Sequence, residues 1–136
     1  MEEKRILSEE ELEAIVGGAP SGGDMASWAW NAYNSGWQFV YGGSRAGAVD
    51  ASGLIYSLVG GGCRTTEAMF ANAPQKGPIS SLPETPGLGL YMPGLVAVYV
   101  GGGMCICALN EDVGVTKMSV SAMPWSAWFE IPGVDY

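Results

Sequence analysis

A glycine-rich loop that leads directly into the start of a helix constrains this chain more than any other stretch. The loop, residues 42–49, carries glycine at 42, 43 and 47, and Asp50 follows it with a side chain well suited to cap a helix. Gly60 is placed to end that helix. Between them, apolar residues recur at helical spacing, at Ala51, Leu54, Ile55, Leu58 and Val59.

Position 51 therefore falls in the first turn of the predicted helix. The free N–H groups and the helix dipole favour a negative charge there. A cysteine at this position would be held as a reactive thiolate, but the chain has Ala51. Alanine at such a place is either a small core residue or the remnant of a lost nucleophile.

Composition limits the classes of protein to which the chain can belong. Its 136 residues suffice for one domain with a real core. The net charge is −8 with only six basic residues, which argues against binding nucleic acid or an anionic membrane, and the glycines and prolines of its longest uncharged span argue against membrane insertion. Cys105 and Cys107, without a histidine or a second pair, are a weak metal signal, so we expect them to be buried free thiols, and we expect no metal site and no cofactor.

Residues 1–18 form a distinct segment that predicts a short amphipathic helix. The segment carries half of the net charge, because it holds six acidic and two basic residues. Residues 19–24 are expected to be a flexible linker. The helix signals are a Ser8–Glu11 capping box, a Leu7–Leu12 staple, an apolar face of Leu12, Ile15 and Val16, and the terminating pair Gly17 and Gly18.

This segment closely resembles a double-glycine leader of the bacteriocin type. The resemblance implies that the peptidase domain of an ABC transporter recognises the leader and cuts after Gly18. The remaining chain would then be secreted by a bacterium. The alternative is an ordinary amphipathic N-terminal helix. The residues to which the resemblance assigns recognition and cleavage are Leu7, Leu12, Ile15, Gly17 and Gly18.

The rest of the chain predicts helices followed by strands. A second helix is expected to open at Asp24 and to end before Gly36, and another to cover residues 65–73. Residues 74–94 are rich in proline and glycine and are expected to form a long loop. Alternating apolar residues predict an α+β fold with an antiparallel meander, with strands at residues 95–100, 104–109 and 113–118 and a last extended segment at 125–131.

Residues 25–136 resemble the NlpC-type cell-wall peptidases, which are papain-like cysteine hydrolases. Residues 49–54 read Val-Asp-Ala-Ser-Gly-Leu where the family has Asp-Cys-Ser-Gly-Leu. Residues 94–101 read Gly-Leu-Val-Ala-Val-Tyr-Val-Gly where the family has Gly-His-Val-Gly-Ile-Tyr-Ile-Gly. Arg64-Thr65-Thr66 also fits. The resemblance implies one papain-like α+β domain over residues 25–136.

The same resemblance assigns roles to individual positions. The family's nucleophile, base and orienting residue fall on Ala51, Leu95 and Cys107, none of which has the required chemistry. No histidine occurs anywhere in the chain, so a cysteine at position 51 would still lack an imidazole base. The resemblance also places three residues beside the substrate, namely Tyr41, Asp50 and Ser52; these could equally be a core tyrosine, a helix cap and a first-turn serine.

Three functions follow as hypotheses. The first is an exported, catalytically inactive homologue of a peptidoglycan stem-peptide endopeptidase that binds a cell-wall peptide or a protein partner. The second is an altered form of a genuine enzyme that hydrolyses γ-D-glutamyl amide bonds, changed at more than one position. The third is a bacteriocin-like cargo of a peptidase-containing ABC transporter.

Overall fold

The computed structural model describes residues 19–136, so the expected leader helix lies outside the described residues. The described helices are α2 (Gly22–Asn34), α3 (Ala51–Val59) and α4 (Thr66–Ala71). The strands are β1 (Gln38–Phe39), β2 (Ser44–Arg45), β3 (Ala48–Val49), β4 (Lys76–Pro78), β5 (Gly89–Met92), β6 (Leu95–Gly101), β7 (Met104–Asn110), β8 (Gly114–Ser119) and β9 (Ala127–Phe129). No helix among these residues is long and apolar enough to cross a membrane.

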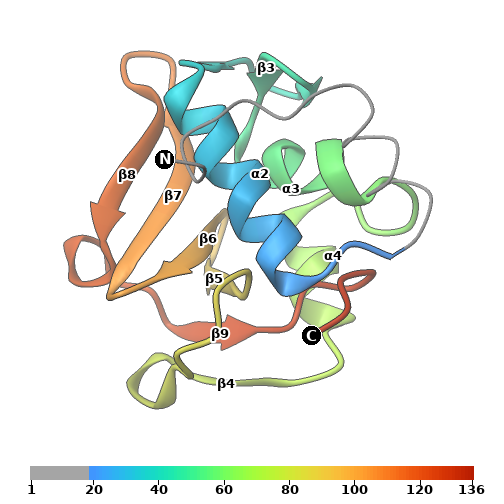
Figure 1. Ribbon diagram of the computed structural model, residues 1–136, viewed down its shortest axis with the longest axis vertical. Coiled ribbons are helices and arrows are strands. Elements are labelled where there is room, and N and C mark those ends of the chain that lie inside the picture. The colour runs from blue at the N-terminus through green and yellow to red at the C-terminus, as the bar shows by residue number, and fades with distance from the viewer. Residues whose placement is uncertain (1–18) are drawn as a thin grey trace.

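One antiparallel sheet of six strands, in the order β4-β9-β5-β6-β7-β8, forms the body of the domain. The three predicted meander strands are confirmed as β6, β7 and β8. Helix α2 crosses in front of this sheet (Figure 1), and both α2 and α3 pack against β6. The predicted α+β architecture is therefore confirmed for residues 19–136.

Apolar side chains cover both faces of the sheet. On β6, Val96 and Val98 face the helices, whereas Ala97 and Tyr99 belong to a second cluster on the opposite face. All four are buried. A strand that is covered on both sides needs apolar residues at every position, which explains the continuous apolar run of β6.

The N-terminal part of the domain differs from its prediction. Helix α2 begins at Gly22, two residues before the predicted Asp24, because Ser21 is its N-cap and Asp24 closes a capping box with it. The predicted linker over 19–24 is wrong for the same region: Pro20 is buried, and Ser21 bridges Asp135 near the C-terminus. Long-range pairing with the end of the chain outweighs the local signal of glycine and proline.

Residues 74–94 are not the long loop that their composition predicts. Strand β5 pairs with β6 across a tight turn, and β4 pairs with β9. The predicted last segment is confirmed as β9, but it lies beside β5, two strands away from β6, instead of following β8 in a meander. These pairings depend on backbone groups meeting across the fold, which residue preferences do not encode.

Cys105 and Cys107 are free, buried thiols on β7, as predicted. Burial raises the pKa of each thiol to about 12. Both thiols therefore stay neutral in the folded chain well above the pH at which an unfolded cysteine ionises, about 8.5.

Alkaline pH is expected to destabilise the domain through these two thiols. Their stabilising contribution is complete below about pH 8.5 and is lost as the pH rises toward about 12, because only the unfolded chain can ionise them in that window. Urea unfolding at several pH values from 8 to 11 measures the slope. A variant with Cys105→Ala and Cys107→Ala should show a shallower slope even if it is less stable; an unchanged slope would contradict the assignment.

Candidate functional site

Asp50 holds the glycine-rich loop against the start of α3. Its Oδ1 accepts the N–H of Gly53 at 2.7 Å, which caps the helix, and its Oδ2 accepts the N–H of Gly42 at 2.9 Å. The Asp50 N–H donates in turn to the Gly43 carbonyl at 3.0 Å. One side chain thus fixes both the helix and the loop that precedes it, and the predicted cap is confirmed. We call residues 42–53 the loop–helix junction.

Arg64, from the segment between α3 and α4, braces this junction from outside it. Its guanidinium donates to the Ser52 hydroxyl at 2.8 Å, the Gly43 carbonyl at 3.1 Å and Asp50 Oδ1 at 3.2 Å. The Arg64–Asp50 contact is an ion pair whose side chains are about a third and a fifth exposed. The sequence showed Arg64 only as part of Arg64-Thr65-Thr66, and no local pattern revealed its three partners.

The junction leaves no room for a side chain at Gly53. A Cβ at this position would lie 1.8 Å from the Gly43 carbonyl oxygen, far inside van der Waals contact. Position 53 therefore requires glycine, because the loop packs closely against the first turn of the helix.

A cleft of about 240 Å³ opens at this junction, between α3, α4 and the start of β6. Of the predicted site residues, it brings together Tyr41, Asp50, Ala51, Ser52 and Leu95. Ala51 is 9% exposed and Tyr41 is 89% exposed, so the first lies at the floor and the second at the rim. The complete lining is Phe39, Tyr41, Asp50, Ala51, Ser52, Thr65, Thr66, Glu67, Gly94, Leu95 and Leu109.

Cys107 is not part of this lining. Strand alternation and pairing place it on the same face of the sheet as Leu95, but it is fully buried and its thiol donates to the Val96 carbonyl at 3.4 Å. A neutral thiol in that position has no ionic character with which to orient a group in the cleft.

Glu67, Thr65, Thr66 and Leu109 belong to the cleft although sequence reasoning did not single them out as site residues. Glu67 Oε2 accepts the N–H of Gly94 at 2.8 Å, which ties the start of α4 to the turn just before Leu95. An acidic residue in the first turn of a helix is a common dipole partner. No local pattern in the sequence therefore places Glu67 beside position 95.

The groups that line the cleft are suited to holding a ligand. Among the described residues that line it, none carries a thiol or an imidazole. The Ser52 hydroxyl accepts a hydrogen bond from the Arg64 guanidinium, whose other nitrogen donates to Asp50, so both side chains are engaged in bracing the junction. The apolar floor at Ala51, Leu95 and Leu109, with carboxylates at Asp50 and Glu67, can hold a peptide by contact and hydrogen bonding.

Arg64→Met is expected to lower the free energy of unfolding by about 1–3 kcal/mol, because the Ser52 hydroxyl loses the donor that Arg64 supplies, and the Gly43 carbonyl and Asp50 each lose one of their donors. Arg45→Met is the matched control, since it removes the same charge from an exposed position on β2. Urea denaturation of both variants measures the difference. Equal loss in the two would show that the brace contributes nothing beyond its charge.

Comparison with known proteins identifies the fold. No protein-family model matches the chain, and no curated protein matches it either. Solved structures do match: NlpC2 from Trichomonas vaginalis has a TM-score of 0.68 at 19% identity, and NlpC1 from Trichomonas vaginalis 0.66 at 21%. Each alignment covers 84% of this chain, but only 47% and 45% of the other protein, so the chain spans less than half of their length.

The NlpC/p60 domain of the peptidoglycan hydrolase SagA matches with a TM-score of 0.64 and 21% identity, over 82% of this chain and 99% of that domain. The class of structure is therefore the NlpC/p60 fold, and the predicted NlpC-type α+β fold is confirmed. At these identities the likeness concerns the fold, and function must be argued from the cleft.

Proposed function

We propose that this chain is an exported, catalytically inactive relative of the NlpC-type cell-wall peptidases, and that its cleft binds a peptidoglycan stem peptide or a protein partner. The observation that carries the proposal is the cleft at the loop–helix junction. Positions 51 and 95, which the resemblance assigns to nucleophile and base, line it together and hold alanine and leucine. The likeness to NlpC/p60 domains of peptidoglycan hydrolases supports a cell-wall ligand.

The hydrogen bonds of the loop–helix junction agree with a protein that has lost catalysis but still binds a ligand. Asp50, Ser52 and Arg64 keep a connected set of hydrogen bonds around Ala51, although none of them serves a nucleophile in this chain. Such a set preserves the shape of the cleft. Acyl transfer needs an activated nucleophile and a proton acceptor, and both family positions lack them.

Titration of the full chain with a synthetic stem peptide, followed by amide chemical shifts, tests the proposal. Shifts should concentrate at the loop–helix junction and at Gly94, and Tyr41→Ala should weaken binding because this exposed side chain lies at the rim. Val113→Ala changes an exposed apolar residue outside the cleft lining and should leave binding unaltered. No shifts at saturating peptide would remove the stem peptide as the ligand.

An altered form of a genuine peptidase is the second candidate, and the preserved junction around Ala51 is the observation that favours it. The native gene should then encode cysteine at position 51 and histidine at position 95. The variant Ala51→Cys with Leu95→His should also hydrolyse a γ-D-glutamyl amide substrate, whereas Ala51→Cys alone should not. Alanine and leucine codons in the native gene would exclude this candidate.

Export depends on residues 1–18, which lie outside the described residues. The pattern from Leu7 to Gly18 supports a leader that the peptidase domain of an ABC transporter removes, and the same pattern supports the reading of the chain as bacteriocin-like cargo. Gly18→Ala should abolish cleavage by a cognate transporter peptidase. Normal maturation of this variant would remove the leader and secretion from the proposal.

A further inference from the structure

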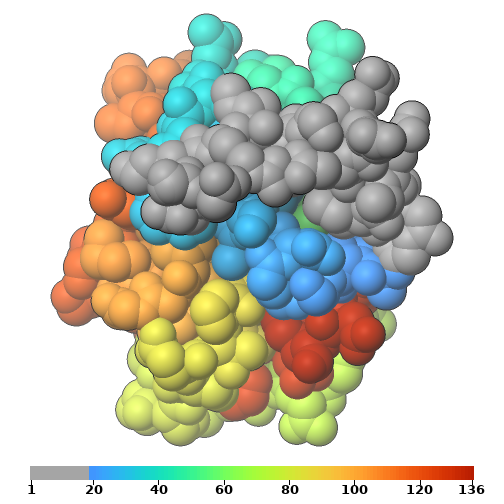
Figure 2. Space-filling model, in the orientation of Figure 1, coloured from blue at the N-terminus to red at the C-terminus, as the bar shows by residue number. Residues whose placement is uncertain are grey.

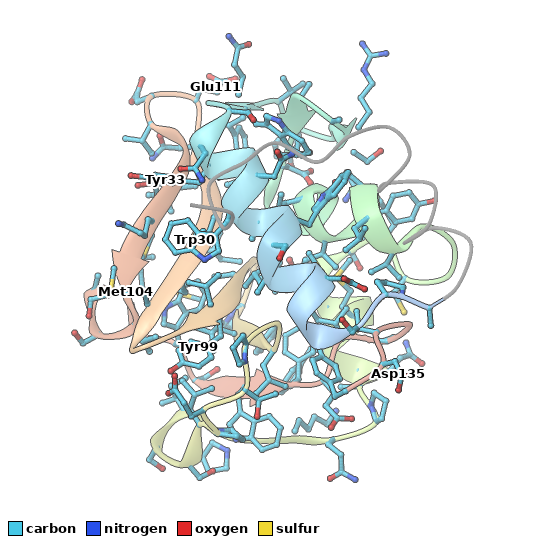
Figure 3. The ribbon with its side chains drawn as sticks, in the orientation of Figure 1. Trp30, Tyr33, Tyr99, Met104, Glu111 and Asp135 are labelled. Carbon is cyan, nitrogen blue, oxygen red and sulfur yellow. The ribbon has the colours of Figure 1, made fainter. Side chains whose placement is uncertain are left out.

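The residues that follow the proposed cleavage point are part of the folded domain. The Pro20 carbonyl accepts the N–H of Asp135 at 2.7 Å, and the N–H of Gly22 donates to the Asp135 carbonyl at 3.1 Å. Pro20 and Gly22 are buried. Figure 3 labels Asp135 near the start of α2, and Figure 2 shows the first atoms of α2 side by side with the C-terminal segment. We call residues 19–22 the N-terminal anchor.

Tyr136 and Gly87 hold the anchor from two further sides. The Tyr136 hydroxyl donates to the Gly87 carbonyl at 2.6 Å and accepts the N–H of Ile131 at 3.1 Å. A Cβ at Gly22 would lie 2.8 Å from the Tyr136 ring, and one at Gly87 would lie 2.1 Å from the Gly22 carbonyl oxygen. Pro20 and Gly22 are therefore closely packed, whereas Ala19 and Ser21 are exposed.

An endopeptidase must bind the chain in an extended form on both sides of the bond that it cuts. On the carboxyl side of the Gly18–Ala19 bond lie Ala19, Pro20 and Ser21, and all three belong to the anchor. A peptidase cannot surround Pro20 while the Pro20 carbonyl accepts from Asp135 and its ring is buried. The rate at which the Gly18–Ala19 bond of the folded protein is cut then depends on the fraction of molecules in which the anchor is open.

We propose that folding of this domain occludes the Gly18–Ala19 bond, so that the leader is removed before the anchor docks or only when it transiently opens. Hydrolysis adds water to that bond, leaving the carboxylate on Gly18 and a free amine on Ala19. The biological meaning rests on the proposed leader, but occlusion is a property of the anchor. The fold thereby makes maturation sensitive to whether the domain has folded.

A surrogate peptidase tests occlusion independently of the leader. In the full chain, residues 14–18 are replaced by the recognition sequence of enteropeptidase, which reads the residues before its cut, so that cleavage falls before Ala19. A second chain carries a flexible glycine-serine spacer between the recognition sequence and Ala19. With two backbone hydrogen bonds and a buried proline to release, the first chain should be cut at least about tenfold more slowly than the second in native buffer.

Asp135→Pro in the first chain removes the N–H that Pro20 accepts and should bring the cutting rate toward that of the spacer chain. Asp135→Asn keeps this N–H and is the matched control, which should be cut as slowly as the parent. Circular dichroism establishes that each variant is folded before its rate is compared. Equal rates for the parent and spacer chains would overturn the proposal, while leaving the Gly18→Ala test of the leader unaffected.

Discussion

Gly53→Ala is expected to lower the free energy of unfolding by more than about 3 kcal/mol, because its Cβ would lie 1.8 Å from the Gly43 carbonyl oxygen. The obstacle is backbone, and it cannot move without breaking the bonds that Gly43 makes to Asp50 and Arg64. Relief of the clash therefore also costs hydrogen bonds. Urea denaturation followed by circular dichroism measures the loss.

Gly23→Ala is the matched control, since Gly23 also lies in the first turn of a helix. There a Cβ would meet only the Ser21 hydroxyl, at an ordinary 3.7 Å. Alanine in a helix is favoured over glycine by up to about 1 kcal/mol, so this variant should be as stable as the parent or slightly more stable. If both variants lose the same stability, close packing at the loop–helix junction does not explain Gly53.

Phe129→Ala is expected to lower the free energy of unfolding by about 3–5 kcal/mol, the usual cost of emptying a buried aromatic site. Phe129 is fully buried on β9 and packs edge-on against Phe70 of α4, with ring centroids 5.6 Å apart. Phe70 in turn stacks on Tyr91 of β5 at 4.0 Å. The ring therefore joins β9, α4 and β5, and thermal and urea unfolding should both report its loss.

Gly89→Ala tests the same packing from the other side. A Cβ at Gly89 would lie 2.5 Å from the Phe129 ring, so the single variant should be clearly destabilised, by about 1–3 kcal/mol. In the Phe129→Ala background the added methyl group has space, and most of this cost should disappear. The two effects are then non-additive, and simple additivity in the double-mutant cycle would contradict the assigned contact.

Much of the fold follows from short-range signals. The Asp50 cap and the Gly60 end of α3 depend on bonds between residues three or four apart, so they can be read along the chain. The alternation along residues 95–100 predicts a strand with two different faces, and β6 has them. The prediction failed at residues 74–94, where glycine and proline indicate turns but pairing partners far along the chain decide.

The candidate site divides in the same way. The family resemblance assigns the nucleophile and base to positions 51 and 95. Both positions line the cleft, together with Tyr41, Asp50 and Ser52. Glu67 and Leu109 could not be found, because neither belongs to a local pattern that indicates a site. Their place in the cleft is set by the approach of α4 and β7 to the loop–helix junction.

The order of residues alone predicts a helix that opens at position 51 with alanine in its first turn, and it shows that no histidine is present to act as a base. The fold, in contrast, is needed to see that Arg64 braces Asp50 from fourteen residues away, and that Asp135 holds Pro20 and Gly22 where a linker was expected. Capping and alternation arise from neighbours along the backbone, whereas these contacts exist only once distant segments have packed together.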